Sequence, residues 1–433
     1  MIKYRNSSIH IQSVRGMHDC LPKDVIQWQY IEDVLKTILN GYGYNEIRFP
    51  IIECTDLFKR SIGEVTDVVE KEMYTFIDQH GNDLTLRPEG TSGCVRAGIE
   101  NSLFYHQEPR LWYMGPMFRR ERPQKGRYRQ FHQFSAEAFG CVGPDIDVEL
   151  ILITNRCWKE LGISNYLTLE LNSIGLLSSR MIYRKKLISF LEKNKHNLDD
   201  SSKRRLYSNP MRILDTKNVK IKELLAHAPV LSDYLDDCSK NHFLNLCRLL
   251  DIANVTYIVN PYLVRGLDYY NRTVFEWVTD KLGVKKTICA GGRYDDLIKQ
   301  LGGGSIPAVG FAIGLERVVL LMKLIKSSII NTRNVYIDVY LIRLGTYYQE
   351  YSIKLSEHIR EKLPFLRLMV DCGGGNFKQQ IDRAEKNNSR FVIVVDDKNF
   401  FEQTIILKEL QSKKQEILKY DEIILKLRKI YNM

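Results

Sequence analysis

Two strand-like runs joined by a basic turn constrain the fold of this chain more than any other segment. The residues from Gly115 to Gln133 include six Lys or Arg and a single acid, Glu121. Pro123 and Gly126 mark a turn between the two runs. The segment therefore predicts a β-hairpin with a cationic tip, which requires a sheet with antiparallel neighbours.

The second run of this hairpin carries a row of polar side chains. Because side chains alternate along a strand, one face of the run combines an aromatic ring with polar groups: Phe131, Gln133, Ser135 and Glu137. The other face is apolar and holds Phe134, Ala136 and Ala138. The same alternation places Arg119 and Glu121 on one face of the first strand. Buried polar groups are costly unless they are paired, so the row predicts a ligand site or a hydrogen-bonded network.

A run of arginines is often only a solvated surface or a general nucleic-acid-binding surface. That explanation covers Arg122, Lys125 and Arg129 at the hairpin tip. It does not explain why Gln133 and Glu137 share a face with an aromatic ring, so a ligand site is the favoured interpretation. A floor of this kind suits a nucleotide together with a small polar ligand.

Composition limits the classes of protein to which the chain can belong. The fractions of hydrophobic (44%) and charged (27%) residues are typical of a soluble globular protein, and 433 residues allow several domains. The formal charge of +11 favours a polyanionic partner. The nine cysteines form no Cys-x-x-Cys pair, which indicates reduced thiols in a cytoplasmic setting and argues against a zinc site. The sequence predicts neither a signal peptide nor a membrane-spanning run.

Periodicity divides the chain into three parts. The first, residues 1–177 and 241–331, predicts an α+β domain with a mostly antiparallel sheet. Its expected elements are a helix at Asp24–Asn40 and strands at Tyr44–Phe49, Lys71–Ile77, Leu84–Arg87, Tyr166–Leu171, Val274–Thr279 and Lys286–Ala290. The second part, residues 178–240, has helical spacing and predicts an inserted helical module. Between Ser178 and Arg205 it holds nine Lys or Arg and three acids, a basic face that either contacts RNA or is merely solvated.

The third part, residues 332–433, alternates strand and helix patterns. The expected strands are Val335–Leu344, Leu366–Val370, Phe391–Val395 and Thr404–Leu407, and the expected helices are Thr346–Leu363, Phe377–Asn387 and Glu416–Tyr431. This order predicts a small α/β domain with a mainly parallel core. Because no catalytic group stands out in it, we interpret it as a recognition module.

The segment before the hairpin offers a second polar group. Thr85, Arg87 and Glu89 have the same parity, and Gly90 and Thr91 lead into a helix. A carboxylate and a hydroxyl at a strand end can bind an α-ammonium group. A helix cap in which Thr91 satisfies backbone amides explains the same residues equally well.

Two more segments offer cations. Arg265 lies between an apolar run and the pair Tyr269 and Tyr270. Core tyrosines usually only pack, but an arginine buried without an anion is costly, so Arg265 predicts a permanent cation in a confined site. Gly310–Arg317 leads into an apolar helix and puts Arg317 in its first turn, where free amides and the helix dipole favour anions. The glycine-rich segments lack Gly-Lys-Ser/Thr, so a P-loop is excluded.

Together these segments resemble the class II aminoacyl-tRNA synthetases, and among them the bacterial type of the histidyl-tRNA synthetase family. The segments that match the three motifs of the class are the helix and strand ending at Pro50, Phe118–Glu121 and Gly310–Arg317. Ala312 replaces a glycine that is common in the third motif. Two segments are specific to the histidine enzymes: Leu263–Thr273 and Ala290–Asp295. The resemblance extends from Arg15 into the C-terminal domain.

The resemblance implies a class II catalytic domain, a helical insertion at 178–240 that clamps the acceptor stem, and an anticodon-binding domain at 332–433. It implies that L-histidine and ATP, with Mg²⁺ on the ATP phosphates, give histidyl-adenylate and pyrophosphate. Histidine then passes to the 3′ end of tRNA(His). The implied enzyme is a cytoplasmic homodimer with no membrane or DNA partner, and no protein ligand of the metal is identified.

The roles of the family's residues carry over to matching positions as implications of the resemblance. Arg265 and Arg119 are the implied catalytic cations at the α-phosphate. The implied histidine-binding residues are Glu89, Gly90, Thr91, Arg119, Gln133, Glu137, Arg265, Tyr269 and Tyr270, with Glu137 and Tyr270 at the imidazole. The implied ATP-binding residues are Arg119, Glu121, Arg127, Phe131 and Arg317, with adenine between Phe131 and Arg317. The tip residues Arg122, Gln124 and Lys125 are implied to meet the tRNA acceptor end.

The serious alternative is a histidyl-synthetase-like protein that binds histidine or RNA without aminoacylation, and a general RNA-binding scaffold is a remote one. Non-catalytic relatives typically lose parts of the motifs or the anticodon-binding domain. This sequence keeps the expected cationic and acidic groups: Arg119, Glu121, Arg265 and Arg317. Catalysis is therefore favoured. A pocket that pairs both imidazole nitrogens rejects apolar analogues by a factor on the order of 10⁴, so no editing domain is expected.

Overall fold

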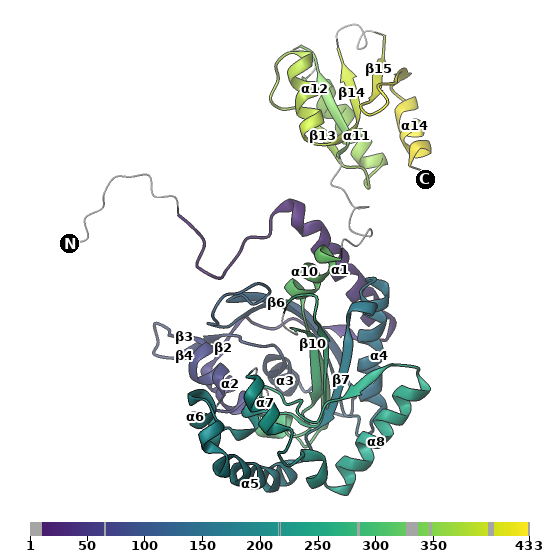
Figure 1. The fold of residues 1–433 in the computed structure, drawn as a ribbon. Coiled ribbons are helices and arrows are strands. Elements are labelled where there is room, and N and C mark those ends of the chain that lie inside the picture. Colours follow the sequence, from purple (N-terminus) through teal and green to yellow (C-terminus); the bar gives the residue numbers. More distant parts are fainter. Residues whose placement is uncertain are drawn as a thin grey trace, which may run out of the picture. The chain divides into compact units, whose positions relative to one another are not determined.

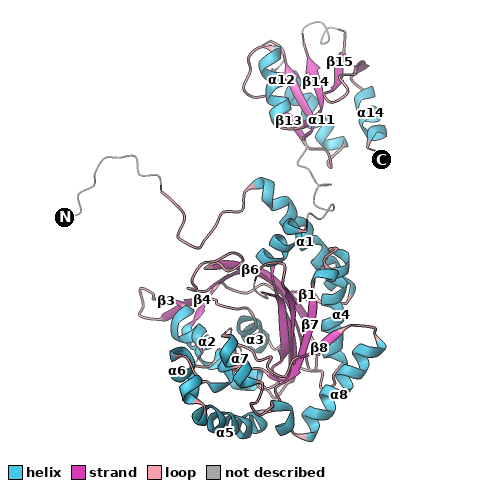
Figure 2. Cartoon of the chain, in the orientation of Figure 1, coloured by secondary structure: helices cyan, strands magenta, loops and turns pink. Residues whose placement is uncertain are grey.

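The chain forms two compact units, residues 1–330 and 331–433, each with its own sheet (Figures 1 and 2). The structure, a computed structural model, describes residues 11–64, 66–214, 216, 218–283, 286–325, 337–345, 349–396 and 402–431. Within these ranges no helix is long and apolar enough to cross a membrane.

An eight-stranded sheet forms the centre of the first unit (Figure 1). In spatial order its strands are β1 (Asn45–Glu46), β5 (Arg110–Phe118), β6 (Gln130–Phe139), β11 (Ala308–Gly314), β10 (Lys286–Arg293), β9 (Asn271–Thr279), β7 (Thr168–Ser173) and β8 (Tyr257–Val259). The two pairs at the sheet edges, β1 with β5 and β7 with β8, are parallel, and the neighbours between them are antiparallel. The mostly antiparallel sheet expected from the sequence is confirmed.

The basic hairpin is formed by β5 and β6, which pair from Arg110 opposite Ala138 to Phe118 opposite Gln130. The turn is confirmed, since Gly126 has a φ of 72° and lies between Gln124 and Arg127, which form an isolated β-bridge. β5 ends at Phe118, so the expected assignment of Arg119 and Glu121 to this strand is wrong. The amide of Arg119 still donates to the carbonyl of Arg129 across the hairpin, at 2.9 Å, and the expected sharing of one face is confirmed, because both side chains line one cavity.

Helices cover both faces of this sheet. The helices that share a hydrophobic core with one face are α1 (Pro22–Gly41), α4 (Asp145–Glu160), α8 (Asp237–Ile252) and α10 (Leu315–Leu324). In α1 the buried residues Ile31, Leu35 and Leu39 recur at four-residue steps, the spacing that places side chains on one side of a helix. The other face packs against α3 (Thr91–Glu100), α9 (Leu297–Gln300) and the inserted module. A 3₁₀ turn, η2 (Ser164–Tyr166), precedes β7.

A small three-stranded sheet lies between α1 and α3 in the chain. Its strands, in spatial order, are β2 (Ile52–Cys54), β4 (Asp83–Leu86) and β3 (Tyr74–Ile77), and α2 (Thr55–Ile62) follows β2. The strand expected over 71–77 begins only at Tyr74, because Val68–Glu72 forms a π-helical turn, η1. The strand expected over 44–49 reduces to the two paired residues of β1.

The inserted module is helical over its described residues, as its spacing predicted. Its α-helices are α5 (Leu177–Lys193), α6 (Asp200–Ser208) and α7 (Val219–Leu225), and its 3₁₀ turns are η3 (Lys195–Asn197), η4 (Pro210–Ile213) and η5 (Leu231–Tyr234). In α5 the residues Tyr183, Leu187 and Leu191 are buried, so one side of this basic helix faces the core, and its cations other than the partly buried Arg180 are exposed.

The second unit contains a five-stranded sheet with the order β13 (Leu368–Val370), β12 (Ile337–Arg343), β14 (Ser389–Val395), β15 (Thr404–Glu409) and β16 (Gln415–Lys419). Its helices are α11 (Gln349–Lys362), α12 (Phe377–Lys386) and α14 (Glu422–Ile430). The first three strands are parallel and the last two antiparallel. The helix expected from residue 416 begins only at Glu422, because the preceding residues pair with β15. Residues 335, 336 and 346–348 of the expected elements lie outside the described ranges.

Candidate active site

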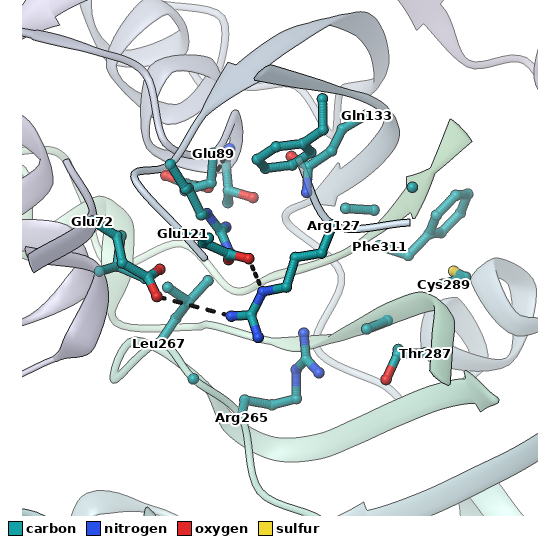
Figure 3. A pocket seen from close by; sticks show the side chains of 18 of the residues that line it. Glu72, Glu89, Glu121, Arg127, Gln133, Arg265, Leu267, Thr287, Cys289 and Phe311 are labelled. Atoms are coloured by element: carbon teal, nitrogen blue, oxygen red, sulfur yellow. Dashed lines mark hydrogen bonds and ion pairs between the residues drawn. The ribbon is translucent and has the colours of Figure 1, made fainter. Parts of the chain in front are cut away.

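A cavity of about 780 Å³ lies in the first unit, between the hairpin, the start of α3 and the segment before β9 (Figure 3). Its size is within the range of roughly 300–1,000 Å³ that is usual for ligand cavities. Most of the residues expected from the sequence line it: Glu89, Thr91, Arg119, Glu121, Arg127, Phe131, Gln133, Glu137, Arg265, Tyr269, Tyr270 and Arg317. Gly90 lies just outside the lining, at the N-cap of α3. The tip residues Arg122, Gln124 and Lys125 are exposed and do not line the cavity.

Glu137, on β6, forms a buried acidic floor at one end of this cavity. Its Oε1 atom accepts hydrogen bonds from the hydroxyls of Thr91, at 2.9 Å, and Tyr113, at 2.8 Å. Its Oε2 atom accepts one from the hydroxyl of Tyr294. Burial raises the pKa of Glu137 to about 7, while these hydroxyl donors favour the ionised form and oppose the rise. The floor is therefore a carboxylate that can change charge near neutral pH.

A glycine on the neighbouring strand makes room for this carboxylate. In the register of β11 against β6, Gly310 lies opposite Glu137. A Cβ atom at position 310 would overlap the Oε2 atom of Glu137. The glycine of the third motif is thus required by close approach rather than by an unusual backbone angle.

Arg265 is held at the cavity wall by a carboxylate that the sequence reasoning did not identify. Its Nη1 atom forms an ion pair with Oε1 of Glu276 on β9, and its guanidinium lies over the ring of Tyr270, 5.6 Å from the centroid. The Oε2 atom of Glu276 accepts a hydrogen bond of 2.8 Å from Thr287 on β10. Burial lowers the pKa of Arg265, but the Glu276 carboxylate together with Tyr270 and Tyr269 outweighs burial, and the pKa lies above its ordinary value. Arg265 is therefore a fixed cation.

Three further arginines converge on the same space. Arg119 donates from Nε to the carbonyl of Pro88, at 2.8 Å, and its guanidinium lies 5.5 Å from the ring centroid of Phe131. Arg317, in the first turn of α10 as expected, donates to the carbonyls of the hairpin turn and of β10. Burial lowers the pKa of Arg317, and the charges of Arg127 and Arg119 lower it further. Cations that destabilise one another in this way favour a polyanion between them.

Arg127 connects the hairpin tip to the π-helical turn. It forms an ion pair with Glu121, and its Nη2 atom lies 3.9 Å from Oε1 of Glu72 (Figure 3). Glu121 is buried, so its carboxylate orients Arg127 into the cavity rather than into solvent. The acid that stood alone in the basic hairpin sequence is thus a partner of one of its arginines.

Glu89 and Thr91 share the cap of α3 and the lining of the cavity in a different way from the one expected. The carboxylate of Glu89 accepts hydrogen bonds from the amides of Thr91, at 2.7 Å, and Ser92, at 3.0 Å. Glu89, and not Thr91, therefore satisfies the free amides at the start of α3. The Thr91 hydroxyl is directed to Glu137 instead, and both side chains still line the cavity.

Sequence reasoning missed several functional groups, and only some of them left a signal. Glu276 is an acid inside an apolar strand, the same kind of signal that revealed Glu137. Tyr113 left none, because a tyrosine in an apolar strand is indistinguishable from a core residue before its partner is known. Arg293 is fully buried, and it bonds both carboxylate oxygens of Asp147, at 3.1 and 2.8 Å. Its role is to fix the end of β10 next to Tyr294.

No metal-binding cluster accompanies these groups. Among the residues that the structure describes, no group of three or more His, Cys, Asp or Glu could hold a metal ion. The two carboxylates nearest the converging arginines, Glu121 and Glu276, are each engaged in an ion pair.

Known proteins resemble both units. Residues 16–318 match a family model described as histidyl-tRNA synthetase, and residues 338–430 match one described as an anticodon binding domain. A curated relative from Blochmanniella pennsylvanica (strain BPEN), named histidine–tRNA ligase, is 67% identical over 433 residues, which are 100% of this chain and 98% of the relative.

Two solved structures resemble the whole chain. The crystal structure of apo histidyl-tRNA synthetase from S. aureus has a TM-score of 0.79 and 33% identity, and covers 96% of this chain and 99% of its own. A structure from Bacillus halodurans, described as an ATP phosphoribosyltransferase regulatory subunit/histidyl-tRNA synthetase, has a TM-score of 0.64 and 20% identity. It covers 90% of this chain and 100% of its own, and at this identity it bears on the fold alone.

Proposed function

From the premise that this chain belongs to the histidyl-tRNA synthetase family, we propose how the residues of its cavity divide between histidine and ATP. The chain is a histidine–tRNA ligase of class II, which activates histidine with ATP as the adenylate and charges tRNA(His) with it. One observation carries the proposal. A buried carboxylate, Glu137, and a group of converging arginines line the same cavity.

The acidic floor takes the imidazole of histidine. Glu137 accepts a hydrogen bond from one ring nitrogen, and the hydroxyl of Tyr270 pairs with the other. A site built to pair both nitrogens rejects apolar side chains, because its own polar groups would be left without partners. Tyr113 and Tyr294 hold the carboxylate in place through their hydroxyls.

The residues at the start of α3, next to Glu137, bind the α-ammonium group of the amino acid. Glu89 and Thr91 lie at the start of α3, where a carboxylate and a hydroxyl together suit an α-ammonium group, and Gln133 lines the cavity beside them. The full set of proposed histidine-binding residues is Glu89, Gly90, Thr91, Arg119, Gln133, Glu137, Arg265, Tyr269 and Tyr270. Gly90 contributes through its backbone, at the point where the chain enters the helix.

The arginines of the cavity bind the nucleotide. Arg119 and Arg265 compensate the charge that develops at the α-phosphate when the histidine carboxylate attacks it, a task that requires positioned cations and no protein nucleophile. Adenine stacks on Phe131, with Arg317 on its other face. Arg127 reaches the terminal phosphates, and Glu121 orients it and contacts the nucleotide.

Mg²⁺ belongs to the proposal as the companion of the ATP phosphates. It prefers oxygen ligands and is usually held by one or two carboxylates together with phosphate oxygens. Glu121 and Glu276 are the carboxylates that would lie beside it, and their existing ion pairs fit a metal held chiefly by the phosphates. When bound, the ion would supply neutralising charge to the leaving pyrophosphate.

The proposed contacts with tRNA lie outside the cavity. The exposed tip residues Arg122, Gln124 and Lys125 are free of the sheet and would meet the acceptor end. The inserted module, residues 178–240, presents its basic faces to the acceptor stem. The catalytic domain would then comprise 1–177 and 241–331, and the anticodon-binding domain 332–433.

We also propose a cytoplasmic homodimer. On one face of the small sheet the central Thr85 is fully covered, and the other face is apolar and open, with Ile52 and Phe76 45% and 42% exposed. Exposed apolar sheet faces mark protein interfaces, and a second copy of the chain is the occupant we infer. The nine cysteines are all free, which suits the reducing cytoplasm.

Exchange of labelled pyrophosphate into ATP tests the proposed site directly. With each of the twenty amino acids as the only activator, we expect exchange with histidine alone. Exchange with an apolar amino acid at a comparable rate would contradict the imidazole floor.

A further inference from the structure

A second cavity, of about 250 Å³, adjoins the active-site cavity at the inserted module. The two share four lining residues: Asp67, Lys71, Arg205 and Arg212. The other residues that line the second cavity are Glu70, Ser201, Arg204, Ser208 and Asn209. We call it the annex. One side of it is the π-helical turn η1 of the catalytic domain, and the other side is formed by α6 and η4 of the inserted module.

The annex carries more positive than negative charge. Its lining holds four cations and two carboxylates. One of these carboxylates, Asp67, is shared by three cations: Arg205 at 3.1 Å, Lys71 at 3.7 Å and Arg212 at 4.0 Å. Lys71 also pairs with the second carboxylate, Glu70, at 3.4 Å. The four cations of the lining still exceed the two carboxylates, so the annex retains a positive excess. In a concave surface such an excess attracts anions.

A residue of the annex also contacts the segment that carries Arg265. The Nη2 atom of Arg212 donates a hydrogen bond of 3.4 Å to the carbonyl of Gly266, the residue that follows Arg265. Arg119, Arg127, Arg205 and Arg212 all line the active-site cavity. A line of cations therefore runs from Arg119 in the active site to Arg205 in the inserted module.

We propose that the annex is an anion subsite that binds a phosphate group beyond the terminal phosphates of ATP. The inference rests on the proposed placement of the triphosphate at Arg127. Two participants in the reaction carry the required chemistry: the pyrophosphate that adenylation releases, and the phosphodiester backbone at the 3′ end of the tRNA. Asp67 limits the affinity of the subsite, because it competes with the phosphate for the same cations.

This competition separates an anion subsite from a mere bridge between two parts of the fold. If the ion pairs only hold the inserted module to η1, Arg205→Gln and Asp67→Asn both remove the same bridge and act in the same direction. If the annex binds a phosphate, the two variants act in opposite directions. Arg205→Gln removes a ligand of the anion, whereas Asp67→Asn removes its competitor.

The first measurement is the KM for inorganic pyrophosphate in the histidine-dependent exchange reaction of the full chain. We expect Arg205→Gln to raise this KM about 3- to 10-fold and Asp67→Asn to lower it by a similar factor, as suits partly exposed charge pairs. Lys203→Gln is the matched control, because this lysine lies on the same helix, is exposed and does not line the annex. It removes the same charge and leaves the KM unchanged.

The second measurement is the transfer of histidine from preformed adenylate to tRNA(His) in a single turnover, at varied tRNA concentration. If Arg205→Gln and Asp67→Asn shift only this transfer step, in opposite directions, the occupant is the tRNA phosphodiester. If they shift only the exchange reaction, in opposite directions, the occupant is pyrophosphate. The inference is overturned if the two variants shift both steps in the same direction, or if neither departs from Lys203→Gln in exchange and from the unsubstituted chain in transfer. Should Arg205→Gln unfold in a thermal melt, Arg204→Gln replaces it, since Arg204 is exposed and its loss leaves the Asp67 pairs intact. Absence of histidine-dependent exchange in the unsubstituted chain would instead refute the proposed active site.

Discussion

Arg265 and Glu276 form an ion pair across the wall of the active-site cavity, and Thr287 holds the carboxylate from the neighbouring strand. The pair places a permanent cation on a rigid support, since Glu276 belongs to the interior of β9. A cation that is already oriented needs no reorganisation when charge develops at the α-phosphate.

Replacement of Arg265 by alanine is expected to slow adenylate formation by a factor on the order of 10² or more. ATP binding should weaken only modestly, because Arg119, Arg127 and Arg317 remain. Single-turnover formation of the adenylate measures the first effect and titration with ATP the second. An unchanged rate would remove Arg265 from the mechanism.

Glu276→Gln serves as the companion variant, because it keeps the size of the side chain and removes the charge that orients Arg265. If Glu276 acts through Arg265, its substitution should cost little in a chain that already carries Arg265→Ala. Full additivity of the two losses would show that Glu276 acts independently.

Replacement of Glu137 by alanine is expected to weaken histidine far more than ATP, since the floor lies at the amino-acid end of the cavity. Phe131→Leu is the matched opposite, because it removes the ring proposed to stack on adenine and spares the floor. The dissociation constants of both ligands for both variants check the assignment. Equal losses of histidine and ATP in Glu137→Ala would argue against an imidazole contact.

The pKa of Glu137 predicts a pH dependence of histidine binding. Burial raises it to about 7, so the carboxylate is protonated below neutral pH and its acceptor capacity falls. Affinity for histidine should therefore increase as pH rises through about 7. In Glu137→Gln only the titration of the ligand's own imidazole, near about 6.5, should remain. Identical profiles for the two proteins would contradict a titrating floor.

The raised pKa of Glu137 also makes the free energy of unfolding depend on pH. The folded chain keeps a proton on Glu137 that the unfolded chain releases above its ordinary pKa of 4.5. Between pH 4.5 and about 7 the folded state binds more protons, so the contribution of Glu137 to the free energy of unfolding falls as pH rises. Thermal unfolding of the chain and of Glu137→Gln should diverge across this window, with the variant gaining relative stability at the higher pH.

Removal of the chain after about Thr332 is expected to spare adenylation and to weaken tRNA charging. The cavity is lined by first-unit residues alone, and the second unit matches an anticodon-binding domain. Pyrophosphate exchange and aminoacylation of tRNA(His) by the truncated chain measure the two activities. Unchanged charging would show that the second unit does not recognise tRNA.

Phe76→Asp is expected to shift a dimer toward monomer, because it places a charge in the open apolar face of the small sheet. Sedimentation at several protein concentrations measures the association. Arg60→Asp, on the exposed side of the adjacent α2, introduces the same side chain and should leave the mass unchanged. A monomeric mass for the unsubstituted chain would contradict the proposed assembly.

The predictions from the sequence were correct where a feature depends on local backbone geometry, and they failed where it depends on tertiary contacts. Strand alternation correctly separated the face of Phe131, Gln133 and Glu137 from the apolar face of β6, because side-chain direction in a strand is a local property. Alternation also grouped Arg119 with Glu121 correctly, but the strand expected to carry them ends at Phe118. Local pattern contains no information about which residue is the last to pair.

Long-range partners were beyond the reach of local pattern for a different reason. The Glu276 side chain meets Arg265 only because the segment before β9 folds back along that strand, and Tyr113 meets Glu137 only through the register of β5 against β6. The strand β16 was mistaken for part of a helix because its residues suit either structure, and pairing with β15 decides between them. Such choices belong to the tertiary fold.

The close approach of Gly310 to Glu137 links the evolution of two positions that are far apart in the chain. A side chain at 310 would displace the carboxylate of Glu137 and crowd the carbonyl of Ala136, so it would disturb the group proposed to recognise the substrate. A change at position 310 is therefore expected to accompany a loss of histidine recognition. A bulkier residue there would identify a paralogue of altered specificity before any assay is made.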